Sequence, residues 1–284
     1  MISGTTRLFG IIGNPVEHSL SPVMHNAAFA AMGLNAVYLP MQPKDPEEGY
    51  RGLRALGFVG VSVTVPFKVA IMPLLDHIDP VATKIGAVNT LLFHKDAQGA
   101  TLCTGSNTDW IGANRALETE IDLLGSTVLI LGAGGAARAV GFGLVEAGAT
   151  ILVHNRTESK GRQLAAQLGA TYFTASELTA VQADVLINTT SVGMTPDHQA
   201  LPIDPKHLSH FSVVMDIVYA PLQTALLREA AACGCRTVDG IQMLLHQGAA
   251  QCNLWTGHDA PLTDMRHALL TELSSRGTAP ATGI

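Results

Sequence analysis

The sequence predicts an α/β protein of two domains, one of them built on a wound parallel sheet. Its 284 residues exceed the usual size of a single domain. Apolar residues make up 47% of the chain and charged residues 14%, a balance typical of a well-buried globular protein. Segments with strand patterns alternate with segments with helix patterns along most of the chain, which indicates α/β architecture.

The first block, residues 1–105, begins with a strand and continues with alternating helices and strands. Ser21 and Pro22 resemble a helix start, with the serine as N-cap and the proline in the first helical position. Valines alternate with small or polar residues in 58–65, as in a strand, and Pro66 starts another helix. The expected elements are strand 7–12, helix 22–32, helix 46–56, strand 58–65, a helix from Pro66, and a hairpin of segments 87–93 and 100–104.

The second block, residues 106–240, repeats a strand–helix pattern that predicts βαβ units and a doubly wound parallel sheet. The expected elements are helix 108–121, strand 126–131, helix 135–147, strand 150–154, helix 158–168, strands 184–188 and 213–217, helix 222–233 and strand 236–238. The helical run 241–254 has no sheet partner here, so we expect helices within 241–273 to complete the first domain. The small, polar segment 274–284 is expected to be a flexible tail.

A glycine-rich turn joins strand 126–131 to helix 135–147 and matches the G-x-G-x-x-A fingerprint of dinucleotide-binding folds. Gly132 permits a tight turn, Gly134 lets backbone amides approach a pyrophosphate, and Ala137 allows close packing of the helix on the sheet. The helix N-terminus adds unpaired N–H groups and a partial positive charge. This context predicts a Rossmann-like domain; a glycine turn without a ligand is the alternative. The predicted binding loop consists of Gly132, Ala133, Gly134, Gly135 and Ala136.

The tip of strand 150–154 indicates which dinucleotide binds. NAD-binding folds usually have Asp or Glu there, about 20 residues after the glycines, to accept from the ribose hydroxyls. Here the tip has Asn155 and Arg156, with Lys160 one turn further, and these groups suit the 2′-phosphate of NADP. Glu158 complicates the prediction, because it favours NAD unless it faces solvent in the first turn of the next helix.

Charge, hydropathy and cysteine spacing argue against several other classes of protein. The 17 basic and 23 acidic residues give a net charge of −6 and form no basic cluster, so no nucleic-acid partner is expected. No apolar run approaches the roughly 18 residues of a membrane-spanning helix, and the first residues lack a secretion signal. We therefore expect a cytoplasmic protein. Its four cysteines have no zinc spacing, so we expect reduced thiols and no metal; a redox pair at Cys233 and Cys235 is the alternative.

Several segments in both blocks carry closely spaced polar residues. In the first 109 residues they are Gly13-Asn14-Pro15, His18 to Pro22, Val63 to Lys68, Gly86 to Thr90 and Asn107 to Asp109. In the second half they are Asn188 to Thr190, Tyr219 with Pro221, Asp239-Gly240 with Met243-Leu244, Gln247, and Trp255 to Gly257. Over residues 9–257 these segments resemble, in the same order, those of the shikimate dehydrogenase family. The resemblance implies reversible NADPH-dependent reduction of 3-dehydroshikimate to shikimate, in aromatic amino-acid biosynthesis.

The resemblance also implies roles for individual residues, and the chemistry of their side chains agrees. Lys68 and Asp109 match the catalytic pair, and a lysine in the first turn of a helix opposes the macrodipole, which hints at a function. Hydroxyls at a helix N-terminus can hold a carboxylate. The matching substrate-binding residues are Ser19, Ser21 and Tyr219 for the carboxylate, and Thr64, Asn89 and Gln247 for the ring hydroxyls. The expected cofactor-binding residues further include Thr157, Thr189, Ile217 and Gly240.

Three positions depart from the family pattern, and other functions stay open. Ser62 stands where the family often has Asn, Ser106 where Asp is common, and Trp110 where Gly is usual. An indole beside Asp109 could narrow the cleft or pack between domains. The alternatives are an NAD-using quinate/shikimate dehydrogenase, a methylene-tetrahydrofolate dehydrogenase, which would not explain the paired serines, and a non-catalytic NADP-binding sensor. The sequence does not fix the oligomeric state, and a homodimer is one possibility.

Overall fold

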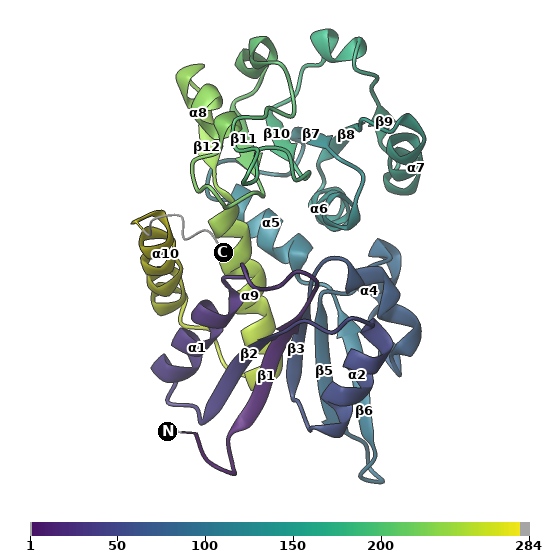
Figure 1. Cartoon of the computed structure of the whole chain (residues 1–284). Helices are drawn as coiled ribbons and strands as arrows, with labels where there is room; N and C mark the ends of the chain where they lie inside the picture. The colour runs from purple at the N-terminus through teal and green to yellow at the C-terminus, as the bar shows by residue number, and fades with distance from the viewer. Residues whose placement is uncertain (1, 279–284) are drawn as a thin grey trace. The chain divides into compact units, whose positions relative to one another are not determined.

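The computed structural model describes residues 2–278, which form two compact units. Of the described residues, unit 1 combines those up to Thr108 with those from Gln247 onward, and unit 2 is Asp109–His246. Each unit has one six-stranded sheet with helices packed against it (Figure 1). An α/β fold with parallel strands was predicted, and it is confirmed.

Unit 1 contains a mixed sheet with the strand order β2-β1-β3-β5-β6-β4. The strands β1 to β3 are parallel, whereas β5 and β6 form an antiparallel hairpin whose turn contains Gly99 at φ +83°. Strand 7–12 and this hairpin were predicted correctly. The strands are β1 Arg7–Ile12, β2 Ala36–Met41, β3 Gly60–Val63, β4 His77–Ile78, β5 Thr90–Lys95 and β6 Thr101–Ser106.

Helices cover both faces of this sheet, as the alternation in β3 requires. Val61 and Val63 point into a core shared with α2 and α3, whereas Gly60 lies against Trp255 of α9 on the other face. On that second face α1 packs against α10. The helices are α1 Ser21–Ala31, α2 Pro46–Ala55, α3 Phe67–Ala70, α4 Pro80–Ile85, α10 Leu262–Thr278, and α9 Gly240–Thr256, which begins in unit 2 and ends in unit 1; η1 is Met72–Leu74.

Some predictions for unit 1 were wrong. Ser21 is the first residue of α1 rather than its N-cap, which is Leu20. Strand β2 was missed because Pro40 interrupts the pattern; β2 lies at the sheet edge, where a proline is tolerated. The segment 274–278, expected to be part of a flexible tail, continues α10. The rest of that expected tail, 279–284, lies outside the described residues.

Unit 2 contains a fully parallel sheet with the order β12-β11-β10-β7-β8-β9, the doubly wound arrangement that was predicted. Buried clusters cover both faces of this sheet. The strands are β7 Thr127–Leu131, β8 Thr150–His154, β9 Thr171–Tyr172, β10 Val185–Asn188, β11 Val213–Asp216 and β12 Arg236–Val238. The helices are α5 Asp109–Leu117, α6 Gly135–Glu146, α7 Glu158–Leu168 and α8 Ala225–Ala232, with η2 Glu177–Ala180 and η3 Pro205–His210.

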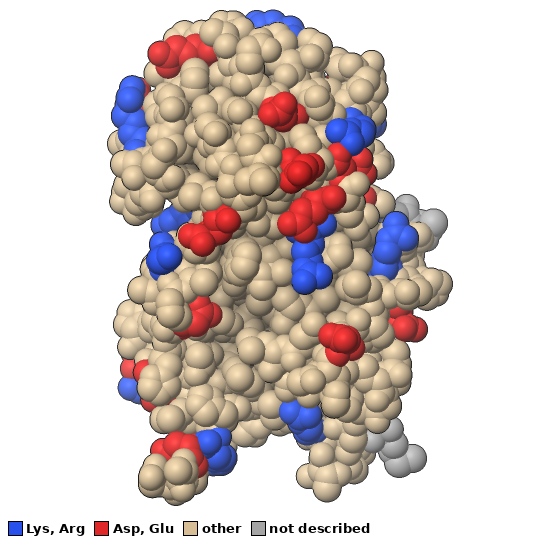
Figure 2. Space-filling model, turned by 180° about the vertical axis from the view of Figure 1, so that it is seen from behind, with Lys and Arg blue, Asp and Glu red and all other residues tan. Residues whose placement is uncertain are grey.

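Surface charge and the described helices add two observations. Acidic and basic side chains are interspersed on the face shown in Figure 2, without a broad basic patch. Within residues 2–278 no helix is both long and apolar enough to cross a membrane. In the same part of the chain the cysteines are free and no three His, Cys, Asp or Glu residues gather into a metal-binding group.

Candidate active site

The turn after β7 has the geometry of a dinucleotide-binding loop. Gly132 has φ +117°, and a Cβ there would lie 2.5 Å from Thr189 Oγ1. The same hydroxyl donates to the Leu131 carbonyl over 2.6 Å, so Thr189, expected to contact the cofactor, also braces the loop. Only glycine can occupy position 132 without displacing this brace.

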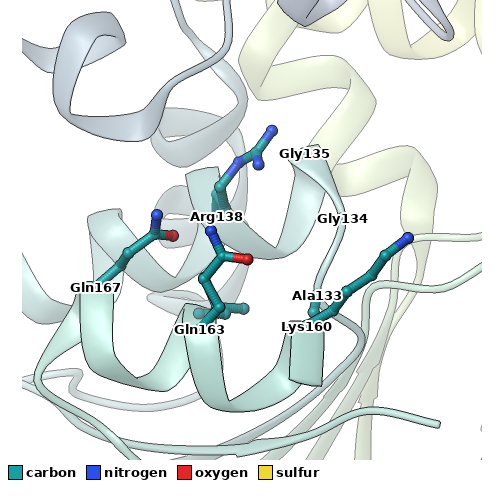
Figure 3. A pocket seen from close by; sticks show the side chains of 8 residues that line it. Ala133, Gly134, Gly135, Arg138, Lys160, Gln163 and Gln167 are labelled. Carbon is teal, nitrogen blue, oxygen red and sulfur yellow. The ribbon is translucent and has the colours of Figure 1, made fainter. Parts of the chain in front are cut away.

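Among the described residues, no side chain caps the N-terminus of α6. Gly134 is its N-cap and gives no side-chain cap, so the first N–H groups of this 12-residue helix can serve a ligand. A Cβ at Gly134 would meet nothing within 4 Å. The cavity beside it measures about 280 Å³, and Figure 3 shows Arg138 from α6 and Lys160 from α7 among its lining side chains. This arrangement fits the pyrophosphate of a dinucleotide.

The tip of β8 presents cations rather than a free carboxylate. Arg156 is exposed, and Asn155 Nδ2 donates to the Thr157 carbonyl over 2.8 Å at the start of α7. Glu158 is exposed and accepts from Arg162 Nε over 2.7 Å, one turn along the helix. The expectation that Glu158 faces solvent is therefore confirmed, and its charge is already paired.

A buried carboxylate links the ends of β10 and β11 and the loop after β11 through hydrogen bonds. Asp216 accepts from Asn188 Nδ2 at 2.9 Å, from Val218 N–H at 3.0 Å and from Thr224 Oγ1 at 2.7 Å. Burial raises the pKa of Asp216 to about 6, although these three donors oppose the shift. Asp216 was not among the residues predicted from the sequence. It fixes the start of the loop that contains Ile217 and the half-buried Tyr219, both expected site residues.

Close packing explains why glycine starts α9. A Cβ at Gly240 would lie 2.5 Å from the Ile217 carbonyl oxygen. The helix start is capped by Asp239, whose carboxylate accepts from the N–H groups of Ile241 and Gln242. The expected cofactor-binding residues Ile217 and Gly240 are therefore brought together in unit 2.

In unit 1 the two expected carboxylate-binding serines lie at the start of α1. Ser19 is half-buried, and its Oγ accepts from the Ser21 N–H over 3.2 Å. Ser21 is buried and is the first residue of α1. Ser19 therefore organises the first turn of the helix that Ser21 begins.

The expected ring-binding amides also meet in unit 1. Asn89 Nδ2 donates to Gln247 Oε1 over 3.4 Å, although 158 residues separate them, and both side chains are buried. Thr64 follows the end of β3 and is half-buried. Its Cγ2 lies 2.3 Å from where a Cβ at Gly13 would be, so that glycine makes room for it.

Lys68 is half-buried in α3, which spans only Phe67–Ala70. Lys68 was therefore wrongly predicted to oppose a helix macrodipole, because a single turn cannot sum enough peptide dipoles to make this position unfavourable. The backbone is held firmly, since the Lys68 carbonyl accepts from the Val88 N–H over 2.8 Å. This bond links α3 to the segment that leads into Asn89.

Three family models match the chain in order. A shikimate dehydrogenase substrate-binding domain covers residues 11–91, a shikimate/quinate 5-dehydrogenase model covers 113–197, and a shikimate 5′-dehydrogenase C-terminal domain covers 240–270. A shikimate dehydrogenase (NADP(+)) of Moorella thermoacetica is 44% identical over 99% of each chain. The chain belongs to the shikimate dehydrogenase family.

Solved structures agree with this membership. The enzyme of Thermus thermophilus, in complex with NADP(H) and shikimate, is 37% identical, with a TM-score of 0.86 over 94% of this chain and 99% of that one. A quinate dehydrogenase of Corynebacterium glutamicum in complex with NAD is 33% identical, with a TM-score of 0.84 over 94% and 99% of the chains. The fold is therefore shared by relatives that differ in cofactor and substrate.

Two departures from the shikimate dehydrogenase pattern now have a structural explanation. Trp110, next to the buried Asp109, packs edge-on against Phe142 of α6 at 6.4 Å between ring centroids. A Cβ at Gly143 would lie 2.9 Å from Trp110 Cβ, so this glycine admits the indole. Ser62 is buried and joins a polar network through its hydrogen bond to Gln251.

That network also contains residues that the sequence analysis missed. They are Tyr38, Thr90 and Gln251, all buried in unit 1. Their signal was weak, because a tyrosine in a strand and a threonine beside Asn89 have ordinary structural explanations. Gln251 could have been found from its spacing, because it lies four residues after Gln247 and therefore on the same face of α9.

Proposed function

We propose that this protein catalyses the reversible NADPH-dependent reduction of 3-dehydroshikimate to shikimate. The observation that carries the proposal is the hydrogen bond between the buried amides of Asn89 and Gln247. The chain that forms it is 44% identical to a shikimate dehydrogenase (NADP(+)). A ring with several hydroxyls needs donors and acceptors placed in a site that excludes water, and apolar walls alone cannot distinguish hydroxyl positions.

In this proposal unit 1 binds the substrate and supplies the proton. Ser19, Ser21 and Tyr219 hold the carboxylate, and Thr64, Asn89 and Gln247 hold the ring hydroxyls. Lys68 is the proton donor for ketone reduction, because the carbonyl oxygen must receive a proton as it gains negative charge. Asp109 is its partner and orients the reacting groups.

NADPH, when bound, supplies the hydride that reduces the carbonyl carbon. Negative charge then develops on the carbonyl oxygen, and Lys68 transfers its proton to that atom. The products are shikimate and NADP+, and the lysine regains a proton from solvent, so atoms and charge balance. In the reverse direction Lys68 accepts the hydroxyl proton.

Unit 2 binds the cofactor in this proposal. The residues Gly132 to Ala136 hold the pyrophosphate, and Asn155, Arg156, Thr157 and Lys160 hold the 2′-phosphate. Pairing of Glu158 with Arg162 supports NADP over NAD, because the carboxylate that would favour NAD already accepts from a neighbouring cation. Thr189, Ile217 and Gly240 complete the proposed cofactor site.

The decisive experiment is a spectrophotometric assay that crosses shikimate and quinate with NADP and NAD. Reduction of NADP by shikimate, with weaker use of quinate and NAD, is the expected result. Faster use of quinate with NAD would favour the quinate/shikimate dehydrogenase alternative, and tight NADP binding without turnover would favour the sensor. Cytoplasmic location and a homodimer are further proposals; light scattering of the purified protein tests the second.

A further inference from the structure

A continuous chain of hydrogen bonds runs through the interior of unit 1, between β2 and the amide of Asn89. Tyr38 Oη donates to Ser62 Oγ over 2.6 Å, and Ser62 Oγ donates to Gln251 Oε1 over 2.8 Å. Gln251 Nε2 donates to Thr90 Oγ1 over 2.9 Å, and Thr90 Oγ1 donates to Asn89 Oδ1 over 2.6 Å. All five residues are buried, so water does not compete for these bonds.

Backbone groups fix the direction of this chain at two points. Gln251 Nε2 lies 3.1 Å from the Asn89 carbonyl, which can only accept, so the amide nitrogen of Gln251 must face it. The Thr108 N–H lies 2.8 Å from Asn89 Oδ1, and an N–H can only donate. The two amide orientations are thus determined, and every hydroxyl between them has one possible sense of donation.

These contacts also determine where the Nδ2 group of Asn89 points. Because Oδ1 accepts from both Thr90 and Thr108, Nδ2 faces Gln247 Oε1 and Thr108 Oγ1. A flipped amide would lose both acceptor contacts and place Nδ2 against the Thr108 N–H. A buried donor without an acceptor is costly, so the Thr108 N–H and the Thr90 hydroxyl, which Gln251 orients, together select one orientation.

We propose that Thr90 and Gln251 are positioning residues, which hold the Asn89 amide with its Nδ2 group toward the ring hydroxyls of the substrate. This inference rests on the proposed function, since it takes Asn89 as a substrate-binding residue. Ser62 belongs to the same hydrogen-bond network. Where the family often has Asn, the short serine here accepts from Tyr38 and donates to Gln251.

The first test is kinetic and uses the whole protein. Thr90→Val removes the hydroxyl with little change in volume, and kcat/KM for shikimate should fall by about five- to a hundredfold, as expected when a buried hydrogen-bonding partner is lost. KM for NADP should not change, and Thr90→Ser should restore most of the loss. Gln251→Met is a second variant with the same expected pattern. Thr256→Val is the matched control, because this α9 hydroxyl donates to the Cys252 carbonyl and accepts from the His258 N–H, and neither group belongs to the network.

A double-mutant cycle separates positioning from general destabilisation. If Thr90 acts through Asn89, Thr90→Val should have no further effect on kcat/KM in an Asn89→Ala background. An equal loss in both backgrounds would overturn the inference. So would unchanged shikimate kinetics in Thr90→Val, or a loss that Thr256→Val reproduces.

A structural readout does not depend on activity. The side-chain amide signal of Asn89, assigned in an ¹⁵N NMR spectrum by its loss in Asn89→Asp, should exchange slowly in the unmodified protein. It should shift and exchange faster in Thr90→Val and Gln251→Met. An unchanged signal would refute the positioning role. Failure of the unmodified protein to reduce NADP with shikimate would refute the proposed function instead, and the NMR result would still decide the orientation.

Discussion

Replacing Arg156 by alanine should erode the preference for NADP over NAD. A charge-assisted hydrogen bond to phosphate contributes about 1.5–3 kcal/mol. Because Arg156 is exposed at the end of β8, where water screens the charge, the lower limit applies. That value corresponds to roughly tenfold in kcat/KM, chiefly through KM for NADP. The NAD reaction should change little, since NAD has no 2′-phosphate.

The neighbouring ion pair supplies the matched control. Glu158→Gln should leave the preference nearly unchanged, because Arg162 already neutralises this carboxylate in the native protein. Arg162→Ala should lower the preference by releasing that charge near the phosphate site. The assay is initial-rate kinetics with NADP and NAD at saturating shikimate. Equal kcat/KM for both cofactors in the unmodified protein, or a strong gain in NADP preference from Glu158→Gln, would refute this reasoning and make Glu158 the determinant.

Two other site predictions can be tested in the same assay. Replacing both Ser19 and Ser21 with alanine should raise KM for shikimate and leave KM for NADP unchanged; reduced stability with unchanged KM for shikimate would mean that the serines only shape the helix start. Lys68→Met should lower kcat by about 10²–10⁴-fold with a modest change in substrate affinity, and Asp109→Asn should also lower kcat. If Lys68→Met kept kcat within a few-fold in both directions, another group must transfer the proton.

The regular parts of the fold were predictable because hydrophobic periodicity and turn residues agree there. Segments 126–131 and 150–154, separated by the helix that follows the glycine turn, left little choice other than parallel strands. Short or interrupted elements were not predictable. Strand β2 contains Pro40, and β4 has only two residues, so neither shows an alternating pattern long enough to detect.

The residues of the candidate site were also predictable only in part from the sequence. Local motifs revealed the glycine loop, the cationic tip at Arg156 and the resemblance around Lys68. Residues that act through long-range contacts gave no local signal. Gln251 reaches Thr90 across 161 positions, and Ser62 looked like a departure from the pattern until Tyr38 and Gln251 were placed beside it. Sequence spacing cannot reveal which buried polar groups satisfy one another; only the fold decides that.

Asp216 should make the stability of unit 2 depend on pH. Its pKa rises from 3.8 to about 6, mainly through burial, so the folded protein binds the proton more tightly than the unfolded chain. Its contribution to stability is therefore greatest below about pH 4 and is lost as the pH rises through about 6, by on the order of 3 kcal/mol. Asp216→Asn cannot titrate, and the other carboxyl groups are common to both proteins. The difference in unfolding free energy between the unmodified protein and this variant, measured with urea at several pH values, should thus shift in favour of the variant as pH rises. A difference independent of pH, or a ¹³C NMR titration with the Asp216 carboxyl near its ordinary pKa, would show that its three hydrogen bonds outweigh burial.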